Sequence, residues 1–135
     1  MEGISNVVII HGSPSRDNTK DKSYVPENLG HWIPWLKEKL EERDIAVFAL
    51  GMPTPWAPIY EEWKNKFEKI SVDENSVLVG HSAGGGFLVR WLGETKKKVK
   101  KLILVAPAII NSGEWEERND LLKFEIDDCV KNNVG

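Results

Sequence analysis

Four short apolar runs recur along the chain, separated by longer amphipathic segments. The runs are Val7–Ile10, Ile45–Leu50, Ser76–Val79 and Leu102–Ala106. Each is almost continuously apolar, whereas a strand with one solvated face would alternate apolar and polar positions. The pattern therefore predicts four buried strands of a mainly parallel sheet.

Three of the intervening segments place apolar side chains at helical spacing, which predicts three helices. Their stripes are Trp32, Leu36 and Leu40, then Ile59, Trp63, Phe67 and Ile70, and then Phe87, Leu88, Trp91 and Leu92. Gly93 is interpreted as the C-cap of the third helix. Strands that alternate with helices predict a three-layer α/β/α fold of the α/β class. We expect four tryptophans on these helices to lie in the core: Trp32, Trp35, Trp63 and Trp91.

The remaining segments carry weaker patterns. Apolar residues after Asn111 indicate a short helix, and Asp127–Asn132 indicates one further turn; the apolar residues are Trp115, Leu121, Leu122 and Phe124. The lysine-rich run Lys96–Lys101 is interpreted as a solvated loop before the fourth strand, because charge runs usually lie in water. The alternative interpretation is a patch that binds phosphate or an anionic membrane.

Length and composition restrict the class of protein. The chain has 135 residues, of which 41% are hydrophobic, and its formal net charge is -3. These values predict one globular domain over residues 1–135 and argue against disorder and against nucleic acid as the main partner. We expect no membrane span, because no run of about 18 apolar residues occurs. The single Cys129 excludes an internal disulfide and favours a reducing, cytoplasmic location.

The strongest chemical signal is a G-x-S-x-G pattern directly after the third apolar run: Gly80-His81-Ser82-Ala83-Gly84. Between a strand and a helix, this pattern is typical of a nucleophile elbow, with Ser82 as nucleophile and the backbone N–H of Ala83 as an oxyanion donor. The glycines are needed because side chains there would collide with neighbouring backbone. Two alternatives are a closely packed turn and a phosphate-binding turn of a nucleotide or flavin domain. The usual nucleotide fingerprints are absent.

The motif His11-Gly12-Ser13 ends the first strand at the same sheet edge. A backbone N–H of Gly12 or Ser13 is therefore the candidate second oxyanion donor. His11 is interpreted as bonded to local backbone, with a role as an improvised base as the alternative. The ring of His81 is expected to point away from the nucleophile, and His31 to cap or pack the first helix. No metal-site spacing is present.

The stretch Gly51–Pro58 contains three prolines and follows the second strand. It is interpreted first as a rigid connection into the next helix. It could also line a substrate pocket with Met52 and Trp56, together with His11. A third interpretation is that Pro55-x-x-Pro58 is displayed to a domain that binds polyproline helices.

Taken in order, these motifs resemble the small single-domain serine hydrolases of the α/β-hydrolase superfamily related to retinoblastoma-binding serine hydrolase. The matching residues are His11-Gly12, His31-Trp32-x-Pro34-Trp35-Leu36, Met52-Pro53-x-Pro55-x-x-Pro58, Trp63, Gly80-His81-Ser82-Ala83-Gly84-Gly85 and Val105-Ala106-Pro107. The resemblance implies a sheet ordered 2-1-3-4, Ser82 as nucleophile, small ester or amide substrates, and neither metal nor cofactor.

The sequence departs from this family in its last part. The family's catalytic Asp and His follow two later strands, whereas no histidine follows Ser82 here. Asp120, Asp127 and Asp128 precede the position of the first of those strands. We therefore expect very weak hydrolysis, or hydrolysis that depends on residues from a missing segment or a partner chain.

The alternative function is a non-catalytic module that binds a ligand or another protein. If the sheet ends with the fourth strand, Leu102–Ala106 becomes an apolar edge, and such an edge favours pairing with another chain. We expect a homodimer formed by twofold antiparallel pairing of this edge strand.

Overall fold

The computed structural model describes residues 3–109 and 119–135. Its elements, in chain order, are β1 (Val7–Ile10), α1 (Arg16–Thr19), a 3-10 turn η1 (Glu27–Leu29), α2 (Trp32–Glu41), β2 (Val47–Leu50), α3 (Tyr60–Phe67), β3 (Val77–His81), α4 (Ala83–Thr95), β4 (Lys101–Val105), α5 (Asn119–Leu122) and α6 (Cys129–Asn133).

The four strands form one parallel sheet in the order β2-β1-β3-β4, which confirms the predicted order. The first strand has the predicted limits, and β2 begins two residues later than predicted, at Val47. The predicted limits of the fourth strand, Leu102–Ala106, were wrong by one residue at each end, because β4 covers Lys101–Val105. Ala106 has a positive φ of 43°, a conformation that turns the chain out of the sheet.

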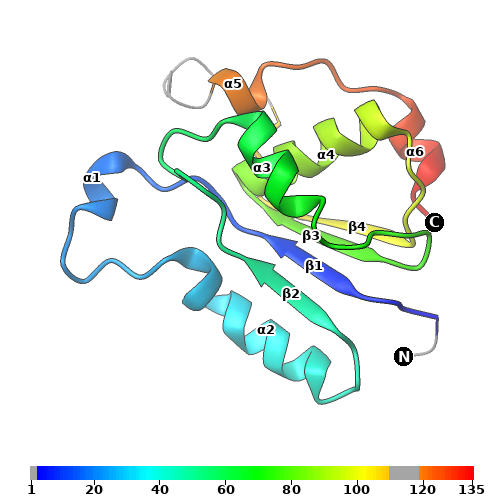
Figure 1. The fold of residues 1–135 in the computed structure, drawn as a ribbon, viewed down its shortest axis with the longest axis horizontal. Coiled ribbons are helices and arrows are strands. Elements are labelled where there is room, and N and C mark those ends of the chain that lie inside the picture. Colours follow the sequence, from blue (N-terminus) through cyan, green and yellow to red (C-terminus); the bar gives the residue numbers. More distant parts are fainter. Residues whose placement is uncertain (1–2, 110–118) are drawn as a thin grey trace.

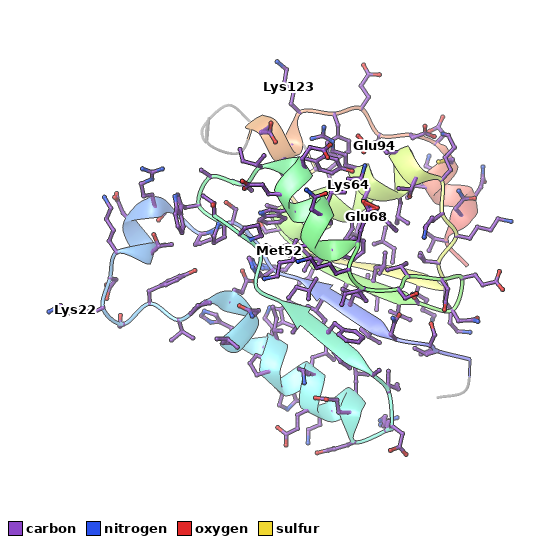
Figure 2. The ribbon with its side chains drawn as sticks, in the orientation of Figure 1. Lys22, Met52, Lys64, Glu68, Glu94 and Lys123 are labelled. Carbon is purple, nitrogen blue, oxygen red and sulfur yellow. The ribbon has the colours of Figure 1, made fainter. Side chains whose placement is uncertain are left out.

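Helices cover both faces of the sheet, as the three-layer prediction required (Figure 1). Side chains of β1 alternate between the two cores: Val7 and Ile9 join the cluster under α2, whereas Val8 and Ile10 join the cluster under α3 and α4. Both faces of β1 are therefore buried, which explains its continuous apolar run. Met52 lies near the centre of the molecule, while Lys22 and Lys123 project at its periphery (Figure 2).

The predicted third helix is longer than its apolar stripe. Gly93 is not its C-cap, because α4 continues to Thr95 and ends at Lys96 in the left-handed conformation. Gly93 instead allows close packing: a Cβ there would lie 3.0 Å from the Cβ of Asp127. The lysine side chains 96–98 are exposed as expected for a solvated segment, but Val99 within the run is buried.

The tryptophans divide between core and surface. Trp63 and Trp91 are buried in an aromatic cluster with Phe67 and Phe87, where ring centroids lie 4.8–5.8 Å apart. The expectation for Trp35 was wrong, because this side chain is 60% exposed on the outer face of α2. Trp32 is only partly buried. A stripe of helical spacing predicts one buried face, and Trp35 lies beside that face rather than on it.

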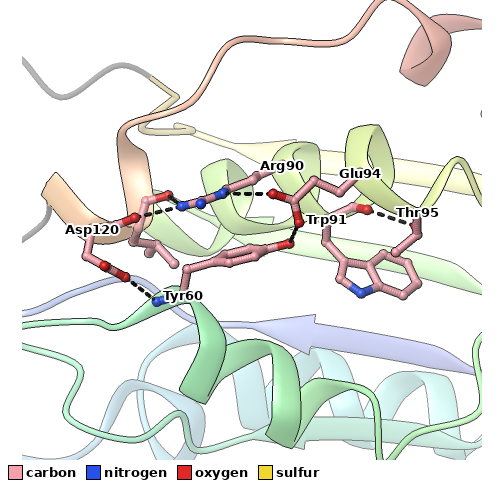
Figure 3. A network of polar contacts seen from close by, with 7 residues as sticks. Tyr60, Arg90, Trp91, Glu94, Thr95 and Asp120 are labelled. Atoms are coloured by element: carbon pink, nitrogen blue, oxygen red, sulfur yellow. Dashed lines mark hydrogen bonds and ion pairs between the residues drawn. The ribbon is translucent and has the colours of Figure 1, made fainter.

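A polar network fastens α5 to α3 and α4 (Figure 3). The Tyr60 backbone N–H donates to the Asp120 carboxylate at 2.7 Å, and the Tyr60 hydroxyl donates to Glu94 at 2.6 Å. Arg90 donates to the carbonyl oxygens of Asp120 and Leu121 and lies 3.8 Å from the centre of the Tyr60 ring. The short predicted helix is α5, which ends at Leu122 and so does not include Phe124, and Trp115 lies outside the described residues. The further turn is confirmed as α6.

No helix within the described ranges is long and apolar enough to cross a membrane.

Candidate active site

Ser82 occupies a sharp turn between β3 and α4. Its backbone has φ 51° and ψ −119°, a strained conformation for a residue with a side chain. Hydrogen bonds on both sides hold it there: the Ser82 N–H donates to the Val105 carbonyl at 3.0 Å, and the Ser82 carbonyl accepts from the Ala108 N–H at 2.9 Å. The end of β4 and the segment after it therefore support the turn that the G-x-S-x-G pattern predicted.

The two flanking glycines are required by sterics, as the sequence argument proposed. A Cβ on Gly80 would lie 2.6 Å from the Cα of Gly85. A Cβ on Gly84 would overlap the carbonyl oxygens of Ile10 and His11. Both obstacles are backbone, which cannot move aside as a flexible side chain would. The glycines thus let α4 start directly against the ends of β1 and β3.

The start of α4 favours negative charge close to Ser82. Ala83 is the first residue of α4, so its N–H is among those that have no partner within the helix. The partial positive charge at the N-terminus of this 13-residue helix adds to the effect. The Ser82 hydroxyl makes no hydrogen bond with any residue in 3–109 or 119–135. The roles of Ser82 and Ala83 in catalysis stay predictions.

The acidic residues near the end of the chain are engaged elsewhere. The Asp120 carboxylate accepts the N–H of Tyr60. The Asp127 carboxylate accepts the N–H of Cys129 at 2.9 Å and pairs with Lys96 at 3.0 Å. These contacts, the Cys129 hydrogen bonds foremost, lower the pKa of Asp127 to about 2. Neither carboxylate acts as a partner of Ser82 in this arrangement.

The Gly12 segment lies directly beside Ser82, at the end of β1. A Cβ on Gly12 would lie 3.1 Å from the Cβ of Ser82, so the two segments pack closely together. The Gly12 N–H donates to the Glu27 carboxylate at 2.9 Å. The Ser13 hydroxyl donates to the Pro55 carbonyl. The Gly12 N–H is thus engaged by Glu27, and the roles of Gly12 and Ser13 as oxyanion donors stay predictions.

His11 is held by backbone on both sides of its ring. Nε2 accepts the N–H of Met52 at 2.8 Å, so Nδ1 carries the proton and donates to the Gly12 carbonyl at 2.6 Å. The side chain is buried, and burial lowers the pKa of its imidazole. The ring is therefore neutral with both nitrogens occupied. This agrees with the interpretation of His11 as a backbone-bonded residue and leaves no free nitrogen for a base.

The ring of His81 was expected to point away from Ser82, and its contacts are with Glu27 and Trp32. Its Nδ1 contacts the Glu27 carboxylate, and its ring meets the edge of Trp32 with centroids 6.0 Å apart. Sequence reasoning missed Glu27, which lies on the irregular turn η1, 54 residues before His81. No periodicity or motif marks it. His31 is the N-cap residue of α2, but its side chain makes no capping hydrogen bond.

Two cavities adjoin this group and share Tyr24 and Glu27 in their walls. The first, of about 380 Å³, is lined by all three predicted pocket residues, His11, Met52 and Trp56. The second, of about 610 Å³, is lined by Trp32, His31 and His81 among others. The structure thus brings the predicted pocket residues together, and their contact with a substrate stays a prediction.

The loop Gly51–Pro58 packs against the body of the protein. The Pro53 carbonyl accepts a hydrogen bond from the indole N–H of Trp63, and the Gly51 carbonyl accepts one from the Lys66 ammonium group. Pro58 is buried, which disfavours display of Pro55-x-x-Pro58 to another domain. The packing favours the interpretations as a rigid connection and a pocket wall.

Within residues 3–109 and 119–135, no three His, Cys, Asp or Glu side chains gather in a way that could hold a metal ion.

Comparison with known proteins identifies the family of this chain. Residues 23–128 match the family described as serine hydrolase, and the chain belongs to that family. No curated protein matches it significantly.

The solved structures similar to this chain have the same fold. The ydeN gene product of B. subtilis superposes with a TM-score of 0.78 at 24% identity, over 96% of this chain and 67% of that chain. A pyrethroid hydrolase from Sphingobium faniae JZ-2 gives a TM-score of 0.53 at 20% identity, over 82% of this chain and 42% of that chain. The chain therefore has an α/β-hydrolase-like fold and spans about two-thirds or less of these proteins.

Proposed function

We propose that this chain is a serine hydrolase for small ester or amide substrates, with Ser82 as its nucleophile. The observation that carries the proposal is the strained Ser82 backbone at the start of α4, with Gly12 packed against it. A packed or phosphate-binding turn has no need to hold a serine in that conformation. Membership of the serine hydrolase family supports the same function.

In the proposed reaction, Ser82 Oγ attacks the carbonyl carbon of the ester or amide while its proton passes to a base. The resulting oxyanion accepts hydrogen bonds from the Ala83 N–H and from a backbone N–H of the Gly12–Ser13 segment. Collapse expels the alcohol or amine and leaves an acyl group on Ser82, which water then removes.

Among the described residues, none is hydrogen-bonded to Ser82 Oγ as a general base would be. His11 has both ring nitrogens occupied, and no histidine follows Ser82 in the sequence. Loss of triad members costs about 10⁴–10⁶ in rate. We therefore propose that the catalytic Asp and His come from residues outside this chain, as the resemblance to relatives of retinoblastoma-binding serine hydrolase implies, and that this chain alone is very slow.

Chemical rescue tests this proposal. Added imidazole supplies a mobile base, so it should accelerate hydrolysis of p-nitrophenyl acetate by this chain beyond its effect in buffer. Ser82→Ala should remove the additional acceleration completely, since imidazole then has no nucleophile to assist. Equal acceleration of the two proteins would overturn the proposed role of Ser82.

A second candidate function is a binding module that pairs through its sheet edge. The observation that favours it is the outer strand β4, in which Ile103 and Val105 are 45% and 38% exposed. An apolar edge strand offers unpaired backbone groups to another strand. We expect a homodimer joined by twofold antiparallel pairing of this strand. We also propose a cytoplasmic location, because the single cysteine of the chain is free.

A further inference from the structure

Glu27 makes two contacts that join separate parts of the candidate site. One carboxylate oxygen accepts the Gly12 N–H at 2.9 Å, and the other contacts Nδ1 of His81. Gly12 belongs to the segment after β1, whereas His81 is the last residue of β3 and directly precedes Ser82. The Glu27 side chain therefore bridges the Gly12–Ser13 segment and the nucleophile elbow.

The bridge lies where a small displacement would matter. A Cβ at Gly12 would stand 3.1 Å from the Ser82 Cβ, 3.3 Å from the Glu27 carboxylate and 3.4 Å from His81 Nδ1. The Gly12 N–H that Glu27 accepts lies in the segment proposed to supply a backbone donor to the oxyanion. An oxyanion donor must lie within about 3 Å of the developing charge, so the position of this peptide bears on the rate.

The surroundings hold Glu27 in place. Its side chain is only 19% exposed, and it lies in the walls of both cavities beside the elbow. The edge-on contact of Trp32 with the His81 ring fixes the second partner of the carboxylate. A partly buried carboxylate with two partners is more ordered than a solvated side chain of the same length.

We propose that Glu27 is a positioning residue of this active site, whose carboxylate ties the Gly12–Ser13 segment to His81 at the base of the nucleophile elbow. The proposal rests on the proposed function, because positioning has a measurable effect only if Ser82 reacts. Glu27 touches no reacting atom and acts through the peptide that it holds.

Three substitutions of Glu27 distinguish the effect of its two contacts from the effect of its negative charge. Glu27→Gln keeps the length, and its carbonyl and amide groups can still reach Gly12 and His81. Glu27→Asp keeps the charge but is one methylene too short to reach both. Glu27→Ala removes both contacts. Glu41→Gln is a matched control, since that carboxylate is an exposed partner of Lys37 on α2.

The measurement is the rate of covalent labelling of Ser82 by a fluorophosphonate probe, with the rate constant at saturating probe and the final labelled fraction recorded separately. A misplaced donor lowers the rate constant, by about 10- to 100-fold for Ala and Asp. Gln should stay within about threefold of the original chain, as should Glu41→Gln. A purely structural effect would instead lower the labelled fraction at an unchanged rate constant.

The outcomes distinguish the two proposals. If the unaltered chain labels no faster than Ser82→Ala, the proposed function fails together with this inference. If it labels at Ser82 and Glu27→Ala labels at the same rate, the proposed function stands and the positioning role is refuted. A Gln variant as slow as Ala, with Asp unaffected, would show that the charge matters and the bridge does not, which also overturns the inference.

Discussion

The imidazole of His11 accepts a hydrogen bond from the backbone N–H of Met52 at 2.8 Å. With the proton on the other nitrogen donated to Gly12, the ring joins the ends of β1 and β2 as a neutral group. Protonation of Nε2 would break the contact with Met52, because a protonated nitrogen cannot accept. A histidine at a strand end beside a nucleophile invites a catalytic interpretation, and here its contacts define a structural one.

This contact predicts a pH dependence of stability. Burial lowers the pKa of His11 in the folded protein below its ordinary value of 6.5, so the unfolded chain binds the proton first. The free energy of unfolding should therefore fall as the pH drops below about 6.5 and be unaffected by this group above it. Urea titrations between pH 7.5 and 5 measure the slope.

His11→Gln is the control, since glutamine does not titrate in this range. The original chain should lose stability more steeply than this variant, by up to about 1.4 kcal/mol per pH unit. Parallel slopes for the two proteins would contradict the description of His11 as a neutral, buried residue.

Gly84→Ala should be severely destabilising. The added methyl group would overlap the carbonyl oxygens of Ile10 and His11, which lie at the end of the inner strand β1. We expect a loss of several kcal/mol, on the order of 3 or more, or failure to fold. Gly51→Ala is the matched control: its methyl group would meet only the flexible amide of Asn28 at 3.1 Å. A similar cost for both substitutions in thermal unfolding would refute the steric account.

Tyr60→Phe should cost about 1 kcal/mol of unfolding free energy, the usual net value of one hydrogen bond. Only the hydroxyl that donates to Glu94 is removed, while the ring keeps its contacts with Phe87 and Arg90. Burial, together with the Glu94 contact, raises the pKa of this phenol, so the hydroxyl remains a donor throughout the neutral range. Denaturation at pH 7 measures the difference, and an unchanged midpoint would mean that the hydrogen bond from Tyr60 to Glu94 in Figure 3 contributes nothing to stability.

Ile103→Lys tests pairing through the outer edge of the sheet. A lysine on an edge strand discourages addition of another strand. Sedimentation at micromolar concentration should find dimers of the original chain and monomers of the variant. Monomers in both samples would exclude the homodimer.

Local chemistry explains how much of this site was predictable. The elbow at Ser82 could be inferred because its glycines are needed by contacts within a few residues and with the adjacent strand ends, and these needs are visible as a motif. The continuous apolar runs defined the sheet because both of its faces are covered. Family resemblance supplied the strand order, which the runs alone do not determine.

The features that were missed depend on contacts between distant segments. Glu27 meets His81 across 54 positions of sequence, and an irregular turn carries no period that would mark it. Gly93 was interpreted as the end of a helix, but it lies within α4, where the absence of a side chain lets Asp127 pack closely against it. Trp35 was placed in the core by its residue type, although its position on α2 faces solvent. In each case tertiary packing decided among locally equivalent choices.

The central claim is that Ser82 is a positioned nucleophile without its base, and the site and speed of fluorophosphonate labelling test it most directly. Peptide mapping by mass spectrometry should find the probe on Ser82 alone, with slow labelling that Ser82→Ala abolishes. Absence of label from Ser82, or label that persists in Ser82→Ala, would contradict the assignment of the nucleophile. Labelling as fast as that of a serine hydrolase with a complete triad would contradict the absence of a base.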